Sequence, residues 1–558
     1  MTWKTGQNHQ SGNSFIHYQY KASAVTQLNT RMKKLITTVI LFCSLIAVQG
    51  QTIWRNPVIP GFHPDPSVCR VGDDYYLVTS SFEYFPGVPL FHSKDLVNWE
   101  QIGHCLTRDS QLNLNGCWAS GGIYAPTIRY FDGLFYMVVT NVSGEGNFYV
   151  TAKDPAGEWS EPFFVNQGGI DPTIFKDDDG KFYFMSNSHT YADGTSRTDA
   201  IMLSEIDIKT GKRLTEPVAI WNGTGGRYPE APHMYKKDGL YYLMAAEGGT
   251  EYGHKVTIAR SKYIYGPYDS APNNPILTHI NRISQNSPIQ GTGHADLVQA
   301  HDGSWWAVFL AFRPQNGNHH LMGRETFLAP VSWPAHGWPA VNGDGTVALE
   351  MSCPTLPLFP AKPAPVRDDF SPPQLAFEWN YLRNPGRANY ALTERPGFLM
   401  LKGSEVTLNE NGSPTFIGRR QQHIDFTATT LLDFTPSANN EEAGITALMN
   451  DRYHFDLVKS KGKLTLRYRL GAISHTEKVV NIGNGPLYLR VTGEAKYLHF
   501  SYSANGKDFA PLGKADTNLI STETAGGFTG VYIGLFTTGN GKKSQTKAWF
   551  DWFDYEGK

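Results

Sequence analysis

The chain has 558 residues and a formal net charge of −2 at pH 7. Its length favours at least two domains, and its charge offers no electrostatic case for binding nucleic acid or an acidic membrane surface. Aromatic residues make up 13% of the chain, alongside 55 glycines and 34 prolines, a mix that favours short strands joined by turns over long helices.

Residues 1–50 are predicted to be an N-terminal extension and an export signal. The stretch KKLITTVILFCSLIAVQG (33–50) combines two lysines, an apolar run and small residues near its end, which is a secretory signal pattern. Its apolar run is shorter than the roughly 20 residues of a membrane span, so no span is expected. Translation is expected to begin at Met32, and cleavage near Gly50 is favoured over a lipid anchor at Cys43. The mature protein is therefore expected to be periplasmic or secreted.

Four cysteines follow this signal, namely Cys69, Cys105, Cys117 and Cys353. Export makes disulfides possible, and Cys105 and Cys117 are the pair closest in sequence, but the spacing alone does not establish a pairing. No CxxC spacing is present, so the sequence indicates no thiolate metal site.

Five segments of the first two-thirds of the chain share one plan, which indicates an internal repeat. Each has a tight polar turn, an aromatic pair and an apolar strand: GDDYYLVTS (72–80), DGLFYMVVT (132–140), DGKFYFMSN (179–187), DGLYYLMAA (238–246) and DGSWWAVFL (302–310). An Asp-Gly turn ahead of alternating apolar residues indicates a β-hairpin. Five such hairpins predict a five-bladed β-propeller over residues 51–352, with five unrelated hairpins in a sandwich as the alternative.

The residues ahead of each hairpin are predicted to form the innermost strand of a blade. These strands read HPDPSV, IYAPTI, IDPTIF, PEAPHM and GHADLV, and their equivalent positions hold Asp65, Tyr124, Asp171, Glu230 and His294. Innermost strands line the channel of a propeller, so the five side chains should converge on its axis. Prolines in four of the five strands favour a stiff, extended backbone that aims these side chains.

Three carboxyl groups at one repeat position favour chemistry over turn capping. Buried acids cost free energy unless they form hydrogen bonds, become protonated or meet a ligand. Close carboxylates push their pKa values apart, which leaves one protonated and another ionised near neutral pH. Glycoside cleavage needs that division, an acid for the leaving oxygen and a carboxylate for water or the sugar carbon. The residues alone predict that Asp65, Asp171 and Glu230 form an acid trio, without separate roles.

Two further residues admit more than one interpretation. His294 could plug the channel, organise water, bind a metal or act as a base, and one histidine without a second ligand motif is weak evidence for a metal. Arg324, in LMGRETFLAPVSW after the fifth hairpin, could form a surface or interblade salt bridge, or present a planar donor fork to sugar hydroxyls or to a carboxylate. The aromatics of SSFEYFPGVPLF (80–91) and Trp118 favour blade packing over sugar platforms.

The composition changes at residues 353–367. That stretch, CPTLPLFPAKPAPVR, is rich in proline and predicts a linker. Beyond it, short alternating runs such as FTATTLLDF (426–434) and KLTLRYRL (463–470) are separated by turns, which predicts an antiparallel, lectin-like β-sandwich over residues 368–558. This module could bind polysaccharide by itself, or pack on the propeller and close its pocket.

Five segments, taken together and in order, resemble the signature segments of glycoside hydrolase family 43: NPVIPGFHPDPSV, GGIDPTIF, YPEAPHMY, GTGHADLV and GRETFLAPVSW. The resemblance is to the two-domain β-xylosidase and α-L-arabinofuranosidase branch, and it covers roughly residues 53–558. It implies a five-bladed propeller and hydrolysis with inversion at the anomeric carbon. By the same resemblance, Asp65 would be the general base that activates water, and Glu230 would be the general acid. Asp171 would orient that acid and keep its pKa raised.

The resemblance also implies roles around the sugar. Arg324 would contact the sugar in the cleavage subsite, and His294 would lie beneath it and organise a calcium ion or its water shell. Tyr124 stands where relatives often carry Trp, and Ile170 where some carry Phe, and both differences alter the wall of the sugar pocket. In that branch a loop of the C-terminal module adds an aromatic to the active site. Phe528, in GGFTGVYIG, is the candidate, although a core position is an equal alternative.

The resulting expectation is an exported, exo-acting, inverting glycoside hydrolase. It would remove terminal α-L-arabinofuranosyl or β-D-xylosyl residues from hemicellulose oligosaccharides such as those of arabinoxylan or xyloglucan, with no required cofactor. A non-catalytic carbohydrate-binding propeller and a retaining fructoside hydrolase are the alternatives. Inversion needs about 6.5–9.5 Å between the two carboxyl groups, whereas retention needs about 5–5.5 Å. The sequence does not separate the arabinofuranoside from the xyloside.

Overall fold

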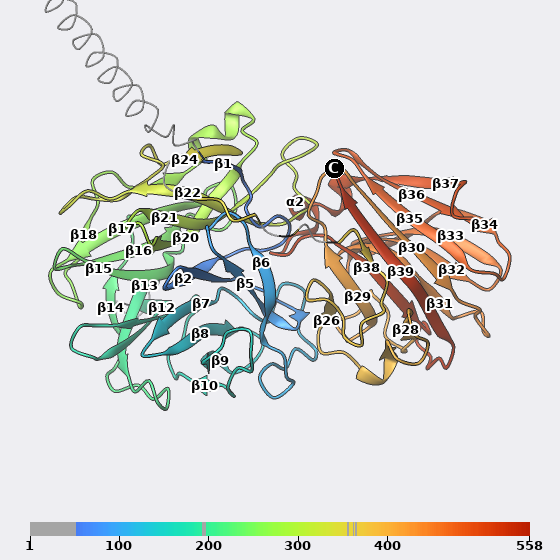
Figure 1. Ribbon diagram of the computed structural model, residues 1–558, viewed down its shortest axis with the longest axis horizontal. Coiled ribbons are helices and arrows are strands. Elements are labelled where there is room, and N and C mark those ends of the chain that lie inside the picture. Colours follow the sequence, from blue (N-terminus) through green and yellow to red (C-terminus); the bar gives the residue numbers. More distant parts are fainter. Residues whose placement is uncertain (1–51, 192–196, 354–355, 361, 363–364) are drawn as a thin grey trace, which may run out of the picture. The chain divides into compact units, whose positions relative to one another are not determined.

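Antiparallel β-strands make up nearly all regular structure in the computed structural model, which describes residues 52–191, 197–353, 356–360, 362 and 365–558. The predicted extension and signal lie outside these residues, as do parts of the predicted linker. Five sheets follow one another along the chain from β2 to β23, and two larger sheets follow them (Figure 1). The predicted five-bladed propeller and C-terminal β-sandwich are confirmed.

Each blade is an antiparallel sheet whose strands run from the channel outward in chain order. Blade one contains β2 (Ser67–Val71), β3 (Asp74–Val78), β5 (Gly87–Ser93) and β6 (Glu100–Leu106). Blade two contains β7 (Thr127–Phe131), β8 (Leu134–Asn141), β9 (Gly146–Ala152) and β10 (Phe163–Phe164). Blade three contains β11 (Thr173–Lys176), β12 (Phe182–Tyr191), β13 (Arg197–Ile206) and β14 (Val218–Trp221). Blade four contains β15 (Glu230–Lys237), β16 (Leu240–Glu247), β17 (Lys255–Ser261), β18 (Asp269–Ser270) and β19 (Leu277–Thr278). Blade five contains β20 (Gln290–Gln299), β21 (Trp305–Phe312), β22 (Glu325–Ser332) and β23 (Ala340–Val341).

Two of the predicted Asp-Gly turns have the backbone that a tight hairpin requires. Asp132 and Gly133 join β7 to β8 with φ values of 52° and 83°, and Asp238 and Gly239 join β15 to β16 with φ values of 52° and 75°. Two-residue hairpin loops favour positive φ at both positions, because this matches the twist of the flanking strands. Asp-Gly therefore sets both loop length and strand register.

The five innermost strands, β2, β7, β11, β15 and β20, form a closed ring in which each contacts the next and β20 returns to β2. The N-terminal segment attaches to the last blade, where Ile59 forms a β-bridge with Thr326 and the Val58 amide donates to the Thr326 carbonyl at 2.9 Å. β1 (Thr52–Arg55) and β24 (Glu350–Cys353) form a short sheet beside it. The ring thus brings the start of every innermost strand around one axis.

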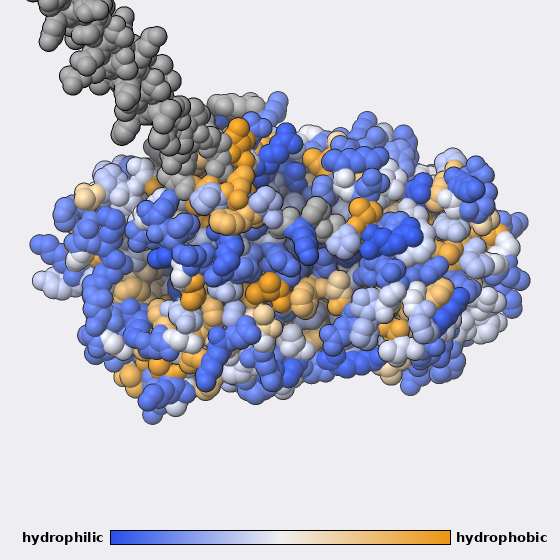
Figure 2. Space-filling model, viewed as in Figure 1, coloured by the Kyte–Doolittle hydropathy of each residue, from blue (hydrophilic) through white to orange (hydrophobic). Residues whose placement is uncertain are grey.

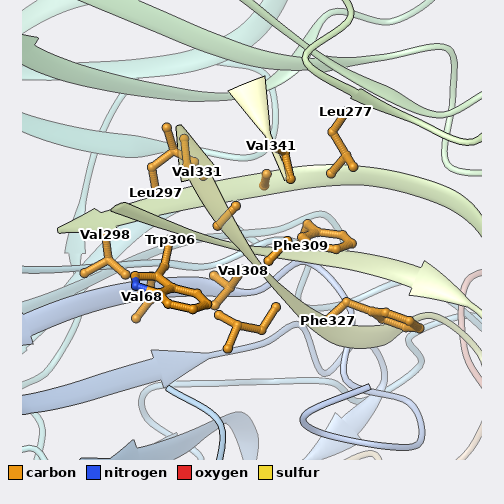
Figure 3. Packing of buried hydrophobic residues seen from close by; sticks show 14 of the residues in the cluster. Val68, Leu277, Leu297, Val298, Trp306, Val308, Phe309, Phe327, Val331 and Val341 are labelled. Atoms are coloured by element: carbon orange, nitrogen blue, oxygen red, sulfur yellow. The ribbon is translucent and has the colours of Figure 1, made fainter. Parts of the chain in front are cut away.

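Blade five packs against its neighbours through a continuous apolar core. Trp306, Val308 and Phe309 of β21 and Phe327 of β22 are fully buried. They belong to one cluster with residues of blades one and four, including Val68 and Leu277 (Figure 3). Residues on both faces of these strands are buried because each blade lies between two others, which gives continuous apolar runs where a half-exposed sheet would alternate.

The C-terminal domain consists of two antiparallel sheets of eight strands each. The first contains β25 (Arg367–Asp368), β27 (Tyr390–Ala391), β28 (Leu399–Lys402), β30 (Phe426–Asp433), β35 (Leu487–Gly493), β36 (Tyr497–Ser503), β37 (Ala510–Asp516) and β39 (Lys547–Gly557). The second contains β4 (Tyr84–Phe85), β26 (Asn380–Leu382), β29 (Thr415–Arg420), β31 (Glu442–Asn450), β32 (Tyr453–Ser460), β33 (Lys463–Leu470), β34 (Ile473–Asn481) and β38 (Tyr532–Thr538). The helical turns are η1 (Ile280–Gln285), η2 (Arg387–Asn389), η3 (Thr517–Ile520) and α2 (Thr522–Ala525).

Strand β4 belongs to the first blade by sequence but to the sandwich by pairing. Its Phe85 and Tyr84 lie opposite Tyr381 and Leu382 of β26, and the Tyr84 ring stacks on that of Tyr532 with centroids 4.0 Å apart. The two domains therefore share a sheet as well as an apolar cluster, and residues 53–558 form one compact unit. Of the two arrangements open from the sequence, the sandwich packs on the propeller.

The cysteines and the surface give two smaller results. Cys69, Cys105 and Cys117 carry free, buried thiols, so Cys105 and Cys117 do not form a disulfide. The face of the molecule in Figure 2 is mainly polar, with apolar residues scattered across it. Within the described ranges, every helix lacks the length and the apolar character that crossing a membrane requires.

A buried polar cluster fills the channel between four blades. Asp296 of β20, which is 0% exposed, accepts hydrogen bonds from Ser67 Oγ at 2.6 Å, Arg129 Nη1 at 2.7 Å and Tyr235 OH at 2.7 Å. Arg129 Nη2 also lies 2.8 Å from His233 Nδ1. The Arg129 guanidinium and its neighbours lower the pKa of Asp296 although burial alone would raise it.

Asp296→Asn is expected to lower the free energy of unfolding by about 3–5 kcal/mol, because it leaves the Arg129 guanidinium buried without its carboxylate. Urea denaturation followed by tryptophan fluorescence measures the loss. The matched control is Asp132→Asn, which removes an exposed pair with Lys176 and should cost no more than about 1 kcal/mol. Equal effects of the two substitutions would contradict the prediction.

Candidate functional site

The eight predicted site residues gather at one end of the propeller channel. They line a single cavity of about 80 Å³ together with Phe82, Ala125 and Thr250. The eight are Asp65, Tyr124, Ile170, Asp171, Glu230, His294, Arg324 and Phe528. Residues from all five blades and from the sandwich thus form one small pocket.

The backbone that carries these side chains is not extended as predicted. Asp65 has a φ of 55°, Asp171 of 54° and His294 of 45°, and Ala231, directly after Glu230, has a φ of 53°. This left-handed conformation costs a non-glycine residue roughly 1–2 kcal/mol. At Asp65 and Asp171 it turns the chain two residues before the innermost strand begins, and at Ala231 and His294 it coincides with irregularities in the register of β15 and β20. The prolines after Asp65 and Asp171 favour extended backbone at these two residues, so the folded ring imposes their positive φ, and the turn directs the carboxyl group into the channel.

Asp65 is held as a carboxylate. Ser80 Oγ donates to Asp65 Oδ2 at 2.5 Å, and Arg324 Nη1 donates to Asp65 Oδ1 at 2.8 Å. His294 Nδ1 lies 3.6 Å from the same Oδ1. Burial alone would raise the pKa of Asp65, but the attraction of Arg324, with His294 and Ser80, outweighs burial and lowers that pKa. This carboxyl group is therefore able to accept a proton at neutral pH.

Asp171 and Glu230 have raised pKa values, whereas that of Asp65 is lowered. Burial, followed by the negative charge of Asp65, raises the pKa of Glu230, and the attraction of Arg324 only partly opposes this. The pKa of Asp171 is raised by burial and then by the charges of Glu230 and Asp65. Because one cation, Arg324, lies among three carboxyl groups, a proton retained by the Asp171–Glu230 pair relieves the repulsion. The trio thus contains a proton donor beside an ionised acceptor.

Arg324 is buried at the centre of the pocket and is not a surface residue. Besides Asp65, its Nη1 contacts Thr250 Oγ1 at 2.7 Å, and its Nη2 donates to the Phe528 carbonyl at 3.3 Å. Its guanidinium carbon lies 5.7 Å from the ring centroids of both Phe82 and Phe528. Of the interpretations open from the sequence, this geometry supports the donor fork that holds a carboxylate.

An aromatic wall encloses the cavity and comes from both domains. The ring centroids of Tyr124 and Phe528 are 6.0 Å apart, and those of Phe82 and Tyr124 are 5.2 Å apart. The Phe528 amide donates to Ser120 Oγ at 2.9 Å, which ties the sandwich loop to the propeller. Phe528 is therefore a wall residue of the pocket.

Sequence reasoning missed Ser80, Phe82 and Thr250. The signal for them is the hairpin register: Ser67 at the start of β2 lies opposite Val78 at the end of β3, so residues just after the second strand lie beside the catalytic turn. The packing interpretation is right for the buried Phe82 side chain, which also lines the cavity, but wrong for Trp118, which is 50% exposed.

His294 is buried beside Asp65, and burial lowers its pKa, so it is neutral at neutral pH. Calcium prefers six to eight oxygen ligands. The portion of the chain that the structure describes has no group of three or more His, Cys, Asp or Glu side chains that could hold a metal ion. The described side chains therefore do not supply the oxygen ligands that calcium prefers.

Comparison with known proteins identifies the class of enzyme that this site defines. Residues 54–339 match the description "Glycosyl hydrolases family 43", and residues 367–556 match "Beta xylosidase C-terminal Concanavalin A-like domain". The chain therefore belongs to glycoside hydrolase family 43, as its motifs predicted, and it is a glycoside hydrolase.

Individual relatives extend over both domains. The chain is 46% identical over 518 residues to a non-reducing end alpha-L-arabinofuranosidase of Bacteroides ovatus, covering 91% of this chain and 95% of the relative. It is 41% identical over 520 residues to a xylosidase/arabinosidase of Butyrivibrio fibrisolvens, covering 90% and 99%. Among solved structures, the Bacteroides ovatus protein described as xyloglucan PUL GH43B matches with a TM-score of 0.86 and 45% identity, over 91% of this chain and all of that one.

Proposed function

We propose that this family 43 enzyme is an exo-acting, inverting hydrolase that releases terminal α-L-arabinofuranosyl or β-D-xylosyl residues from hemicellulose oligosaccharides. The observation that carries the proposal is the geometry of the pocket, where Asp65, paired with Arg324 at 2.8 Å, lines one small cavity together with Asp171 and Glu230. Both names occur among the relatives, and the solved relative is described by a xyloglucan locus, which supports a pentose as the sugar and a plant polysaccharide as its source.

The proposed reaction uses each carboxyl group once. A water molecule gives its proton to Asp65 as its oxygen bonds to the anomeric carbon. The bond from that carbon to the leaving oxygen breaks, and the leaving oxygen takes the proton of Glu230. Asp171 shares the buried site with Glu230, and the proton that this pair retains is the one available to the leaving oxygen. The product then has the opposite anomeric configuration.

The size of the cavity supports exo action. At about 80 Å³ it is far smaller than the roughly 300–1,000 Å³ of sites for larger ligands, so it suits one sugar unit at a chain end. The buried Arg324 guanidinium supplies donors for sugar hydroxyls, and the rings of Phe82, Tyr124 and Phe528 cover the apolar faces of the sugar. Export through the signal at residues 33–50 and a calcium ion near His294 stay predictions.

Two measurements test the proposed function together. The protein is assayed in parallel on 4-nitrophenyl α-L-arabinofuranoside and β-D-xyloside, and proton NMR follows the anomer that forms first. Turnover of at least one pentoside with an inverted first product is expected. A retained anomer would contradict the proposed roles of Asp65 and Glu230. Saturable oligosaccharide binding without turnover would instead favour a carbohydrate-binding propeller.

A further inference from the structure

A single carboxylate from the sandwich contacts two separate propeller segments beside the pocket. Glu523, in α2, accepts hydrogen bonds from the backbone amide of His320 at 2.9 Å, from His320 Nδ1 at 2.7 Å and from Tyr252 OH at 3.4 Å. The Thr522 amide also donates to the His320 carbonyl at 3.0 Å. The side chain of His320 is 7% exposed and that of Glu523 is 23% exposed, so this contact is largely shielded from water.

Both contacted segments lead directly to Arg324. His320 lies four residues before Arg324 on the same chain segment, and Tyr252 lies two residues after Thr250, whose Oγ1 is 2.7 Å from Arg324 Nη1. Glu523 therefore holds the backbone that carries the guanidinium and the loop that carries one of its hydrogen-bond partners.

The Arg324 side chain borders a second cavity besides the small pocket. Behind Arg324 the two domains leave a cavity of about 200 Å³, lined by residues including Thr250, Tyr252, His320, Arg324 and Glu523. A side chain next to open space can relax into it when a hydrogen bond is removed. The hydrogen bonds of Glu523 lie on the boundary of that space.

The backbones of the two domains meet closely at Gly323 and Gly530. An added Cβ at Gly323, whose φ is 67°, would lie 3.1 Å from Gly530, and one at Gly530 would lie 2.6 Å from the carbonyl carbon of Met322. The Val531 amide donates to the Leu321 carbonyl at 2.8 Å. This seam holds residues 321–323, directly before Arg324, and the Glu523 contacts hold the adjoining His320 and the separate loop of Tyr252.

We propose that Glu523 is a positioning residue for catalysis, a role that rests on the proposed function. It acts through His320 and Tyr252 to keep Arg324 against the carboxylate of Asp65. The sandwich thereby controls the charge state of the base at a distance.

A displacement of Arg324 would change the pKa of Asp65, and the pH dependence of activity reports that change. The charged and titratable groups that act on Asp65 are Arg324, His294, His254, Asp171 and Glu230. Arg324 is the strongest of the influences that favour the carboxylate. If Arg324 moves away, the pKa of Asp65 rises, and a base that must be ionised then loses activity at a higher pH. The titratable groups that contact Glu523 are His320 and Tyr252. Glu251, which adjoins Tyr252 in the chain, pairs with Arg227.

Glu523→Ala is expected to shift the acidic limb of the kcat/KM–pH profile upward by about half a pH unit or more, and to lower kcat/KM at the optimum about tenfold. Glu523→Gln keeps one acceptor oxygen and should show a smaller shift. The matched control is Glu477→Ala, which removes an exposed histidine–carboxylate pair with His475 on β34 and should leave the profile unchanged.

The outcomes separate this inference from the proposed function. An active wild-type enzyme whose acidic limb does not move in Glu523→Ala, at an unchanged melting temperature, would overturn the positioning role. If Glu523→Ala does not fold, Glu523→Gln decides by the same criterion. Absence of wild-type pentoside turnover at every pH would refute the proposed function instead. In that case a crystal structure of Glu523→Gln still tests the inference, through the distance between Arg324 and Asp65.

Discussion

Asp65→Asn is expected to lower kcat on both nitrophenyl pentosides by ~10²–10⁴-fold, the range that a general base contributes. An amide has nearly the same shape but cannot take the proton from water, and it also leaves the buried Arg324 without its carboxylate. Steady-state kinetics near neutral pH measure the loss, and the substrate dissociation constant should change far less than kcat.

A second substitution separates proton acceptance from local geometry. Ser80→Ala removes the 2.5 Å hydrogen bond to Asp65 Oδ2 but leaves the carboxylate and its contact with Arg324 in place. It should cost less than Asp65→Asn, on the order of ten- to a hundredfold, because a hydrogen bond to a charged group contributes about 1.5–3 kcal/mol and each 1.4 kcal/mol is a factor of ten. Full activity of Asp65→Asn would show that another group serves as the base.

Glu230→Gln is expected to have an effect of similar size that depends on the leaving group. On oligosaccharides the leaving oxygen is an alcohol that needs a proton, so kcat/KM should fall by ~10²–10⁴-fold. Nitrophenolate leaves without a proton, so the loss on nitrophenyl pentosides should be much smaller. Parallel kinetics on a nitrophenyl pentoside and a hemicellulose oligosaccharide measure the difference, and equal losses on both would contradict the role of acid.

The alkaline limb of the pH profile belongs to the same residue. The proposed role of acid requires a protonated Glu230, so activity should be present below its pKa and fall as the pH rises through it. Burial and Asp65 raise that pKa, which places the limb above the ordinary range of a glutamate, and Glu230→Gln should remove the limb. Glu251→Gln is the control: the charge of Glu251 also raises the pKa of Glu230, so its loss should move the limb to lower pH without removing it.

The parts of this fold that the sequence predicts are those specified locally. The five Asp-Gly or similar turns with their aromatic pairs predict the blades, because turn chemistry and strand periodicity both act over a few residues. The equivalent positions of Asp65, Asp171 and Glu230 then follow from the repeat, and the closed ring of innermost strands brings them together. The sandwich is predicted for the same local reason.

Features that depend on contacts between distant segments could not be predicted. Strand β4 pairs with β26, which lies almost 300 residues later in the chain, and no local sequence pattern predicts that pairing. The left-handed backbone at Asp65 and Asp171 is a property of the folded ring, since the prolines beside them favour extended chain. Ser80, Thr250 and Glu523 have no motif of their own, and only the assembled hairpins and the docked sandwich show what they hold.

The loop around Phe528 makes the C-terminal domain part of the pocket wall. Because its ring and its carbonyl oxygen both contact Arg324, the domain is a part of the active centre and not an appended module. Transplanting this domain from one relative to another would alter the catalytic chamber itself.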